Sequence, residues 1–157
     1  MRKILVLGLG NEILGDDAVG ILCAREIKKI FSDKIDVIET SESGLRIIDY
    51  LLNYNKVLIL DSTFVGENKV GEIREYVFDK DFKSFSLPSP HYVSISTAIK
   101  IAQILELNPA LEIKILAMGI DKVLTIGSKL SNRVKDSFDE YVARAKKILE
   151  NWLSEIN

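Results

Sequence analysis

Short apolar runs and longer amphipathic stretches alternate along the chain. The short runs are rich in Val, Ile and Leu, which is typical of strands buried on both faces of a sheet. They cover residues 3–8, 35–40, 56–61 and 112–119. In the longer stretches, apolar residues recur mostly every three or four positions and predict helices with one apolar face. These helices cover residues 18–31, 43–53, 92–107 and the C-terminal part of the chain, where Ser131 can cap the last helix.

Strands that alternate with helices indicate an α/β fold. Right-handed connections between parallel strands place helices on both faces of the sheet. Residues 71–78 add a strand that suits a sheet edge, and residues 79–90 form a polar loop with two prolines. We therefore expect a three-layer sandwich whose mostly parallel, twisted sheet has about five strands. The chain shows no repeat, linker or low-complexity segment, which favours a single domain over residues 1–157.

Composition and charge restrict the class of partner. Of the 157 residues, 47% are apolar and 28% are charged, as in an ordinary globular protein. The 21 Lys and Arg residues against 23 Asp and Glu residues leave a net charge of -2, which gives no electrostatic reason to expect nucleic acid or an anionic membrane as a partner. No apolar run approaches the roughly 20 residues of a membrane span. Proteins or small molecules are the expected partners.

Cys23 is the only cysteine, and it falls inside the first predicted helix. A single cysteine excludes an internal disulfide and suits a reducing compartment. Because the first residues meet a glycine turn before a signal-peptide core can form, we expect a cytoplasmic protein. The position of Cys23 within the helical pattern predicts a buried, inert thiol rather than a nucleophile.

Four side chains that could bind a metal or take part in catalysis fall at the edge of the sheet where the predicted parallel strands end. Asp16 and Asp17 follow the first strand, Asp61 closes the third, and His91 lies between the polar loop and a helix. Sheets of this type bind ligands outside the carboxyl ends of their strands. One of the neighbours Asp16 and Asp17 would join Asp61 and His91 in a set of two carboxylates and one imidazole. Such a set suits a borderline divalent cation such as nickel or zinc.

Each of these residues also has a purely structural interpretation. Asp16 or Asp17 could cap the first helix, where a carboxylate meets free N–H groups. Asp61 could bind the backbone of the turn that follows it. His91 could be a surface loop residue. The combination at one edge of the sheet favours the metal site over these separate interpretations.

A glycine-rich turn after the first strand raises the alternative of a dinucleotide site. Gly8 and Gly10 match the start of the G-x-G-x-x-G pattern, but Ile13 stands where the third glycine belongs. Glu39, at the end of the second strand, is similar to the acid that binds a ribose. The adjacent pair Asp16 and Asp17 argues against a pyrophosphate, since like charges at about 4 Å cost several kcal/mol in a partly desolvated site.

Three segments resemble the hydrogenase maturation endopeptidases, which process the large subunit of nickel-iron hydrogenases. They are GLGNEILGDDAVG (residues 8–20), LILDSTFVG (residues 58–66) and SPH (residues 89–91). The first is the most specific, because it joins G-x-G-N to an acidic pair and to a glycine near a helix start. The likeness extends over most of the chain and implies one maturation-protease-like domain over residues 1–157.

The resemblance implies the activity and the site. Asp17, Asp61 and His91 would be the metal ligands and the catalytic residues of an endopeptidase that removes the C-terminal extension of a nickel-loaded large-subunit precursor. The nickel would arrive in that precursor, and no organic cofactor is implied. Asp16 would serve as a helix cap, a supporting group or an alternative ligand. The chain departs from the family at Asp121 and Lys122, where an acid or amide followed by proline is frequent.

Other hydrolase chemistries fit less well. The chain has no G-x-S-x-G segment, and a single histidine excludes the H-E-x-x-H zinc motif. Two aspartates alone could form an acid-protease dyad, but that would leave His91 and the glycine turn without a role. A nucleotide-binding α/β domain and a nickel-binding accessory protein that does not cleave stay as alternatives. The sequence gives no indication of the oligomeric state.

Overall fold

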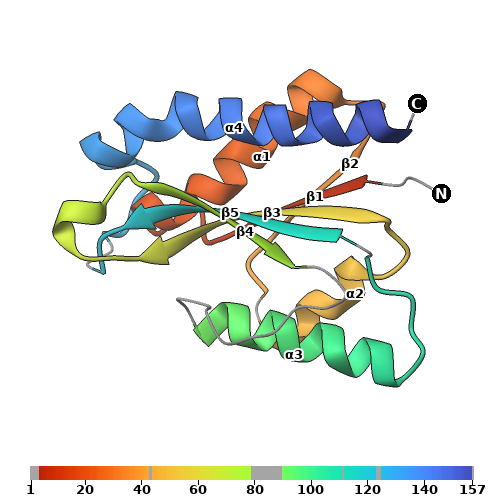
Figure 1. Ribbon diagram of the computed structural model, residues 1–157. Coiled ribbons are helices and arrows are strands. Elements are labelled where there is room, and N and C mark those ends of the chain that lie inside the picture. Colours follow the sequence, from red (N-terminus) through yellow and green to blue (C-terminus); the bar gives the residue numbers. More distant parts are fainter. Residues whose placement is uncertain (1–3, 43, 79–89, 111, 123–124, 157) are drawn as a thin grey trace.

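The computed structural model describes residues 4–42, 44–78, 90–110, 112–122 and 125–156, with side chains in the helix that begins at residue 90 described from residue 97 onward. Within these ranges, five strands form one sheet in the order β2-β1-β3-β5-β4 (Figure 1). They are β1 (Ile4–Leu9), β2 (Asp36–Thr40), β3 (Lys56–Phe64), β4 (Ile73–Phe78) and β5 (Glu112–Ile120). Only β4, at one edge, runs antiparallel to its neighbour. The predicted mostly parallel sheet is confirmed.

Helices cover both faces of this sheet (Figure 1). α1 (Val19–Phe31) and α4 (Asn132–Ile156) lie on one face, and α2 (Ile48–Leu51) and α3 (Pro90–Ile104) lie on the other. In the part of the chain that the structure describes, three short 3-10 turns join the larger elements: η1 (Gly15–Ala18), η2 (Gly44–Ile47) and η3 (Glu67–Lys69). None of the helices in the described ranges is both long and apolar enough to cross a membrane. The three-layer sandwich predicted from the sequence is confirmed.

Side chains of β3 divide between two cores. Leu58 and Leu60 are buried in the cluster formed with α1 and α4, whereas Val57 and Ile59 are buried in the cluster on the opposite face. Because successive side chains of a strand point to opposite faces, Asp61 continues the second set. The end of β3 therefore directs Asp61 toward the layer that contains α2 and α3.

α1 crosses the sheet at Gly20. A Cβ atom there would lie 2.4 Å from the carbonyl oxygen of Leu60 and 2.7 Å from that of Leu9. Both distances are too short for any side chain, so glycine is what lets the helix approach β1 and β3 this closely. The close crossing brings η1, which directly precedes α1, against β3.

Two helix boundaries differ from the sequence prediction. The helix predicted over residues 43–53 is reduced to η2 and α2, because Leu52 is extended and pairs with Pro109. α3 begins at Pro90 instead of after His91, since proline is well suited to the first turn of a helix. The backbone of His91 therefore belongs to the first turn of α3.

Candidate active site

β1 and β3 are neighbours in the sheet, yet the chain leaves them in opposite directions. After β1 the chain runs to β2 on one side, and after β3 it runs to β4 and β5 on the other. Such a reversal opens a crevice at the carboxyl ends of the two strands. β1 pairs with β3 only as far as Gly8 and Leu60, whereas β5 accompanies β3 to Phe64. Residues 61–64 therefore continue β3 past its pairing with β1, three residues beyond the predicted strand end.

Asp17 lies in η1 with both carboxylate oxygens engaged. The backbone N–H of Asn11 donates to Oδ2 at 3.1 Å, and the hydroxyl of Ser62 donates to Oδ1 at 2.8 Å. The turn that leads to Asn11 depends on Gly10, whose φ of +149° lies in the region that favours glycine and whose added Cβ would lie 2.0 Å from the Asp17 carbonyl oxygen. The residues of the glycine turn thus fix the position of the Asp17 carboxylate.

Asp61 lies on the other side of the crevice. Its Oδ1 accepts a hydrogen bond from the backbone N–H of Ser62 at 2.7 Å. Burial raises the pKa of Asp61 to about 8, the Ser62 N–H opposes this rise, and the nearby charge of Asp17 adds to it. The residue as a whole reaches solvent at the crevice, but its carboxyl group is closely surrounded by protein.

Ser62 joins the two aspartates. Its hydroxyl donates to Asp17 and its backbone N–H donates to Asp61, so one residue contacts both carboxylates, and the charge of Asp17 acts on Asp61. Below them, the buried hydroxyl of Tyr141 in α4 lies 3.1 Å from the carbonyl oxygen of Asp61 and 2.8 Å from that of Leu116 in β5. The backbone that carries Asp61 is therefore anchored to the last helix.

The third predicted ligand is only partly placed. The backbone of His91 lies in the first turn of α3, and its side chain lies outside the described residues. α3 covers the face of the sheet toward which Asp61 points. Among the described side chains, no group of three or more metal-ligating residues occurs. The structure brings Asp17 and Asp61 together, and the participation of His91 stays a prediction.

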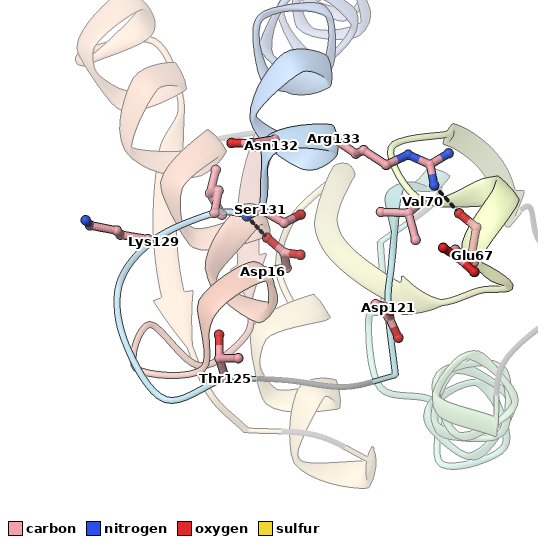
Figure 2. Close-up of a pocket in the computed structure, with 10 residues that line it drawn as sticks. Asp16, Glu67, Val70, Asp121, Thr125, Lys129, Ser131, Asn132 and Arg133 are labelled. Atoms are coloured by element: carbon pink, nitrogen blue, oxygen red, sulfur yellow. Dashed lines mark hydrogen bonds between the residues drawn. The ribbon is translucent and has the colours of Figure 1, made fainter.

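Asp16 has a different role from the one its sequence position suggests. The start of α1 has no side-chain cap, so the predicted cap of the first helix is wrong. The carboxylate of Asp16 instead accepts the backbone N–H of Ser131 at 2.6 Å, and Ser131 accepts the first hydrogen bond of α4 through its carbonyl. Figure 2 shows this contact. Asp16 therefore caps the last helix, where its charge meets the positive end of the helix dipole.

A cavity of about 490 Å³ is lined in part by Asp16, the neighbour of Asp17 in η1. Asp16, Asp121 and Glu67 line it together with Lys129 and Arg133, and Figure 2 shows Arg133 donating to the backbone carbonyl of Glu67. Asp17 and Asp61 are not part of its lining. The cavity is therefore a charged neighbour of the crevice, and Asp16 in η1 is the link between the two.

Comparison with known proteins identifies the family. Residues 21–148 match the profile of a family described as hydrogenase maturation protease. The chain belongs to this family. The matched range contains Asp61 and His91 and begins shortly after Asp17. The resemblance seen in the sequence motifs is thereby confirmed.

Curated relatives and solved structures resemble this maturation protease over most of its length. The hydrogenase expression/formation protein HupD of Bradyrhizobium diazoefficiens is 22% identical over 96% of this chain and 80% of its own. The solved structure of the hydrogenase maturating endopeptidase HybD from Escherichia coli superimposes with a TM-score of 0.76 at 19% identity, covering 95% of this chain and 93% of that one. HybD from Thermococcus kodakarensis gives 0.70 at 22% identity, with 93% and 98% covered. These structures share the α/β fold.

Two residues singled out for rival functions are occupied elsewhere in the maturation protease. Glu39, the candidate ribose acid, accepts hydrogen bonds from the guanidinium of Arg25 at 3.0 to 3.2 Å, and Arg25 also contacts Glu12. Cys23 is fully buried in α1, as predicted, and burial raises the pKa of its thiol above the usual range. Neither a ribose acid nor a thiolate nucleophile is available at these positions.

Sequence reasoning missed two supporting residues of the crevice. Ser62 directly follows Asp61, so its position in the sequence already places it at the same strand end. Asn11 belongs to the glycine turn, where its N–H donates to the Asp17 carboxylate and its side-chain oxygen accepts the N–H of Ile13 at 3.2 Å. A polar residue next to a candidate ligand is the signal that could have found both.

Proposed function

We propose that this maturation protease is an endopeptidase that removes the C-terminal extension of a nickel-loaded hydrogenase large-subunit precursor. Asp17, Asp61 and His91 would recognise the nickel ion that the precursor carries. The observation that carries the proposal is the Asp17–Ser62–Asp61 arrangement at the crevice between β1 and β3. It gives two carboxylates beside one another in a chain of this family.

The charge of the crevice supports a cation as the recognised group. Within the described residues, neither Asp17 nor Asp61 forms an ion pair with a lysine or arginine. The raised pKa of Asp61 reflects burial together with repulsion from Asp17. A divalent cation placed between the carboxylates would favour their charged forms. Binding of the precursor's nickel would therefore release a proton from Asp61 near neutral pH.

The residues of this chain would position the substrate. Ser62 and Asn11 hold Asp17, and Tyr141 holds the backbone of Asp61, so the nickel of the precursor would meet a preformed set of oxygens. Fixing the metal also fixes the peptide bond that lies next to it in the precursor. A metal ion so placed can polarise a carbonyl group or lower the pKa of an attacking water.

Cleavage of a purified precursor, prepared with and without nickel, tests this function. We expect the wild-type protein to cleave only the nickel-loaded form. Asp17→Asn, Asp61→Asn and His91→Gln should each lower kcat/KM at least about 100-fold while each variant stays folded under the assay conditions. Asp33→Asn, at an exposed turn, is the control for loss of one carboxylate.

Two results would decide against the proposal. Wild-type rates in all three site variants would show that these residues do not recognise the metal. Nickel binding by the isolated protein without cleavage of the nickel-loaded precursor would identify an accessory protein instead of a protease.

A further inference from the structure

Large apolar side chains are exposed at the edge of the sheet where Asp17 and Asp61 lie. Each follows or ends a different parallel strand: Ile13 after β1, Leu45 after β2, Phe64 at the end of β3 and Ile126 after β5. Their exposed fractions are 60%, 56%, 53% and 89%. We call these four residues the apolar rim. Because the four strands are parallel, all four residues lie at the same edge of the sheet as the crevice between β1 and β3.

Backbone hydrogen bonds hold part of the rim in place. The N–H of Gly127 donates to the carbonyl of Ile13 at 2.8 Å, and the N–H of Gly15 donates to the carbonyl of Gly127 at 2.8 Å. These bonds join the loop that carries Ile13 to the loop that carries Ile126. The backbone next to both isoleucines is therefore tied together by hydrogen bonds.

Hydrogen bonds and a shared strand connect the rim to Asp17 and Asp61. The N–H of Ile13 donates to the side chain of Asn11, and the N–H of Asn11 donates to the carboxylate of Asp17. On the other side of the crevice, Phe64 lies two residues after Ser62 in the same strand. The backbone of this chain therefore links the rim to both carboxylates. A partner that contacts the rim is brought close to Asp17 and Asp61.

An apolar rim around charged groups is the pattern of a protein interface. Exposed apolar clusters next to polar groups mark interaction sites, and the buried anchors of such interfaces are large side chains. A cation that is held inside another protein can reach Asp17 and Asp61 only if that protein approaches this edge of the sheet. A free peptide would not need contacts from four separate strand ends.

We propose that the apolar rim is the docking surface for the folded body of the large-subunit precursor. This inference rests on the proposed function, because it takes the precursor as the substrate. Ile13 and Ile126 would pack against apolar surface surrounding the precursor's nickel site and would bring the metal to the carboxylates. The rim contributes binding and leaves the chemical step to the residues of the crevice.

Steady-state cleavage of the nickel-loaded precursor tests the rim. The double variant Ile13→Lys with Ile126→Lys should raise KM at least about tenfold and leave kcat within about twofold, because these contacts are equal in the bound substrate and in the transition state. The matched control is Ile104→Lys with Leu105→Lys. These two side chains are 79% and 62% exposed at the end of α3, which leads to the start of β5 at the opposite edge of the sheet.

The outcomes separate the two proposals. A raised KM in the rim variant and an unchanged KM in the control support the docking surface. An unchanged KM in the rim variant, with cleavage by the wild type, overturns the rim and leaves the proposed function standing. If the rim variant loses only self-association of the protein, the rim is an interface between copies of this chain and the docking proposal is wrong. Failure of the wild type to cleave overturns the proposed function and this partner together.

Discussion

Replacing Asp61 by asparagine should change how the stability of the protein depends on pH. In the unfolded chain an aspartate has its ordinary pKa of 3.8, whereas in the folded protein burial raises the pKa of Asp61 to about 8. Between these values the folded state holds a proton that the unfolded state has lost. The contribution of Asp61 to stability is therefore fully present below about pH 4 and is lost as the pH rises to about 8.

The size of the effect follows from the same two pKa values. Each unit of difference corresponds to about 1.4 kcal/mol, so the difference between 3.8 and about 8 sets an upper limit of about 6 kcal/mol. Solvent that reaches the residue at the crevice reduces this figure, and we expect a loss of about 2 to 6 kcal/mol. Asp61→Asn carries no titrating group and should lack this component of the pH dependence.

Urea unfolding at intervals between pH 4 and pH 9 provides the measurement. The free energy of unfolding of the wild type minus that of Asp61→Asn should fall between pH 4 and about pH 8 and then level off. Asp33→Asn is the control for removing one carboxylate. A difference that stays constant within about 0.5 kcal/mol would refute the reasoning. It would mean that the Asp61 carboxyl is solvated in the folded protein and that the charge of Asp17 does not raise its pKa.

Two further substitutions test the framework of the site. Gly20→Ala should lower the free energy of unfolding by about 1 to 3 kcal/mol, because its Cβ would press on the carbonyl oxygens of Leu60 and Leu9, while Gly66→Ala, whose Cβ would meet only the Asn68 side chain at 3.3 Å, should change it little in urea unfolding. Tyr141→Phe should cost about 1 to 3 kcal/mol by calorimetry, since it removes a buried hydroxyl from two carbonyl oxygens, and an unchanged melting temperature would contradict those contacts.

The sequence predicted the meeting of Asp17 and Asp61 because a general rule covers it. Carboxyl ends of adjacent parallel strands lie at one edge of the sheet, and the alternating pattern of strands and helices is strong in this chain. No comparable rule places His91, which follows a long segment with no clear strand or helix pattern in the sequence, so its distance from the aspartates could not be predicted from spacing.

Contacts between distant segments were the ones that the sequence did not predict. Asp16 is beside α1 in the sequence, and local capping rules assign it to that helix. In the folded protein it contacts Ser131, which is 115 residues away, because the loop before α4 returns to η1. The continuation of β3 to Phe64 likewise depends on its pairing with β5, more than fifty residues further along the chain.

These long-range contacts have a consequence for the order in which the protein is made. Asp16 is bound by Ser131, and the backbone of Asp61 is bound by Tyr141, so both sides of the crevice depend on α4. When the ribosome has made only about the first hundred residues, Asp16 and Asp61 are already part of the chain. The helix α4, whose start and side chains bind them, has not yet been made. The crevice can reach its final form only after residues 131–141 have emerged. A half-made chain therefore lacks a finished site for its substrate.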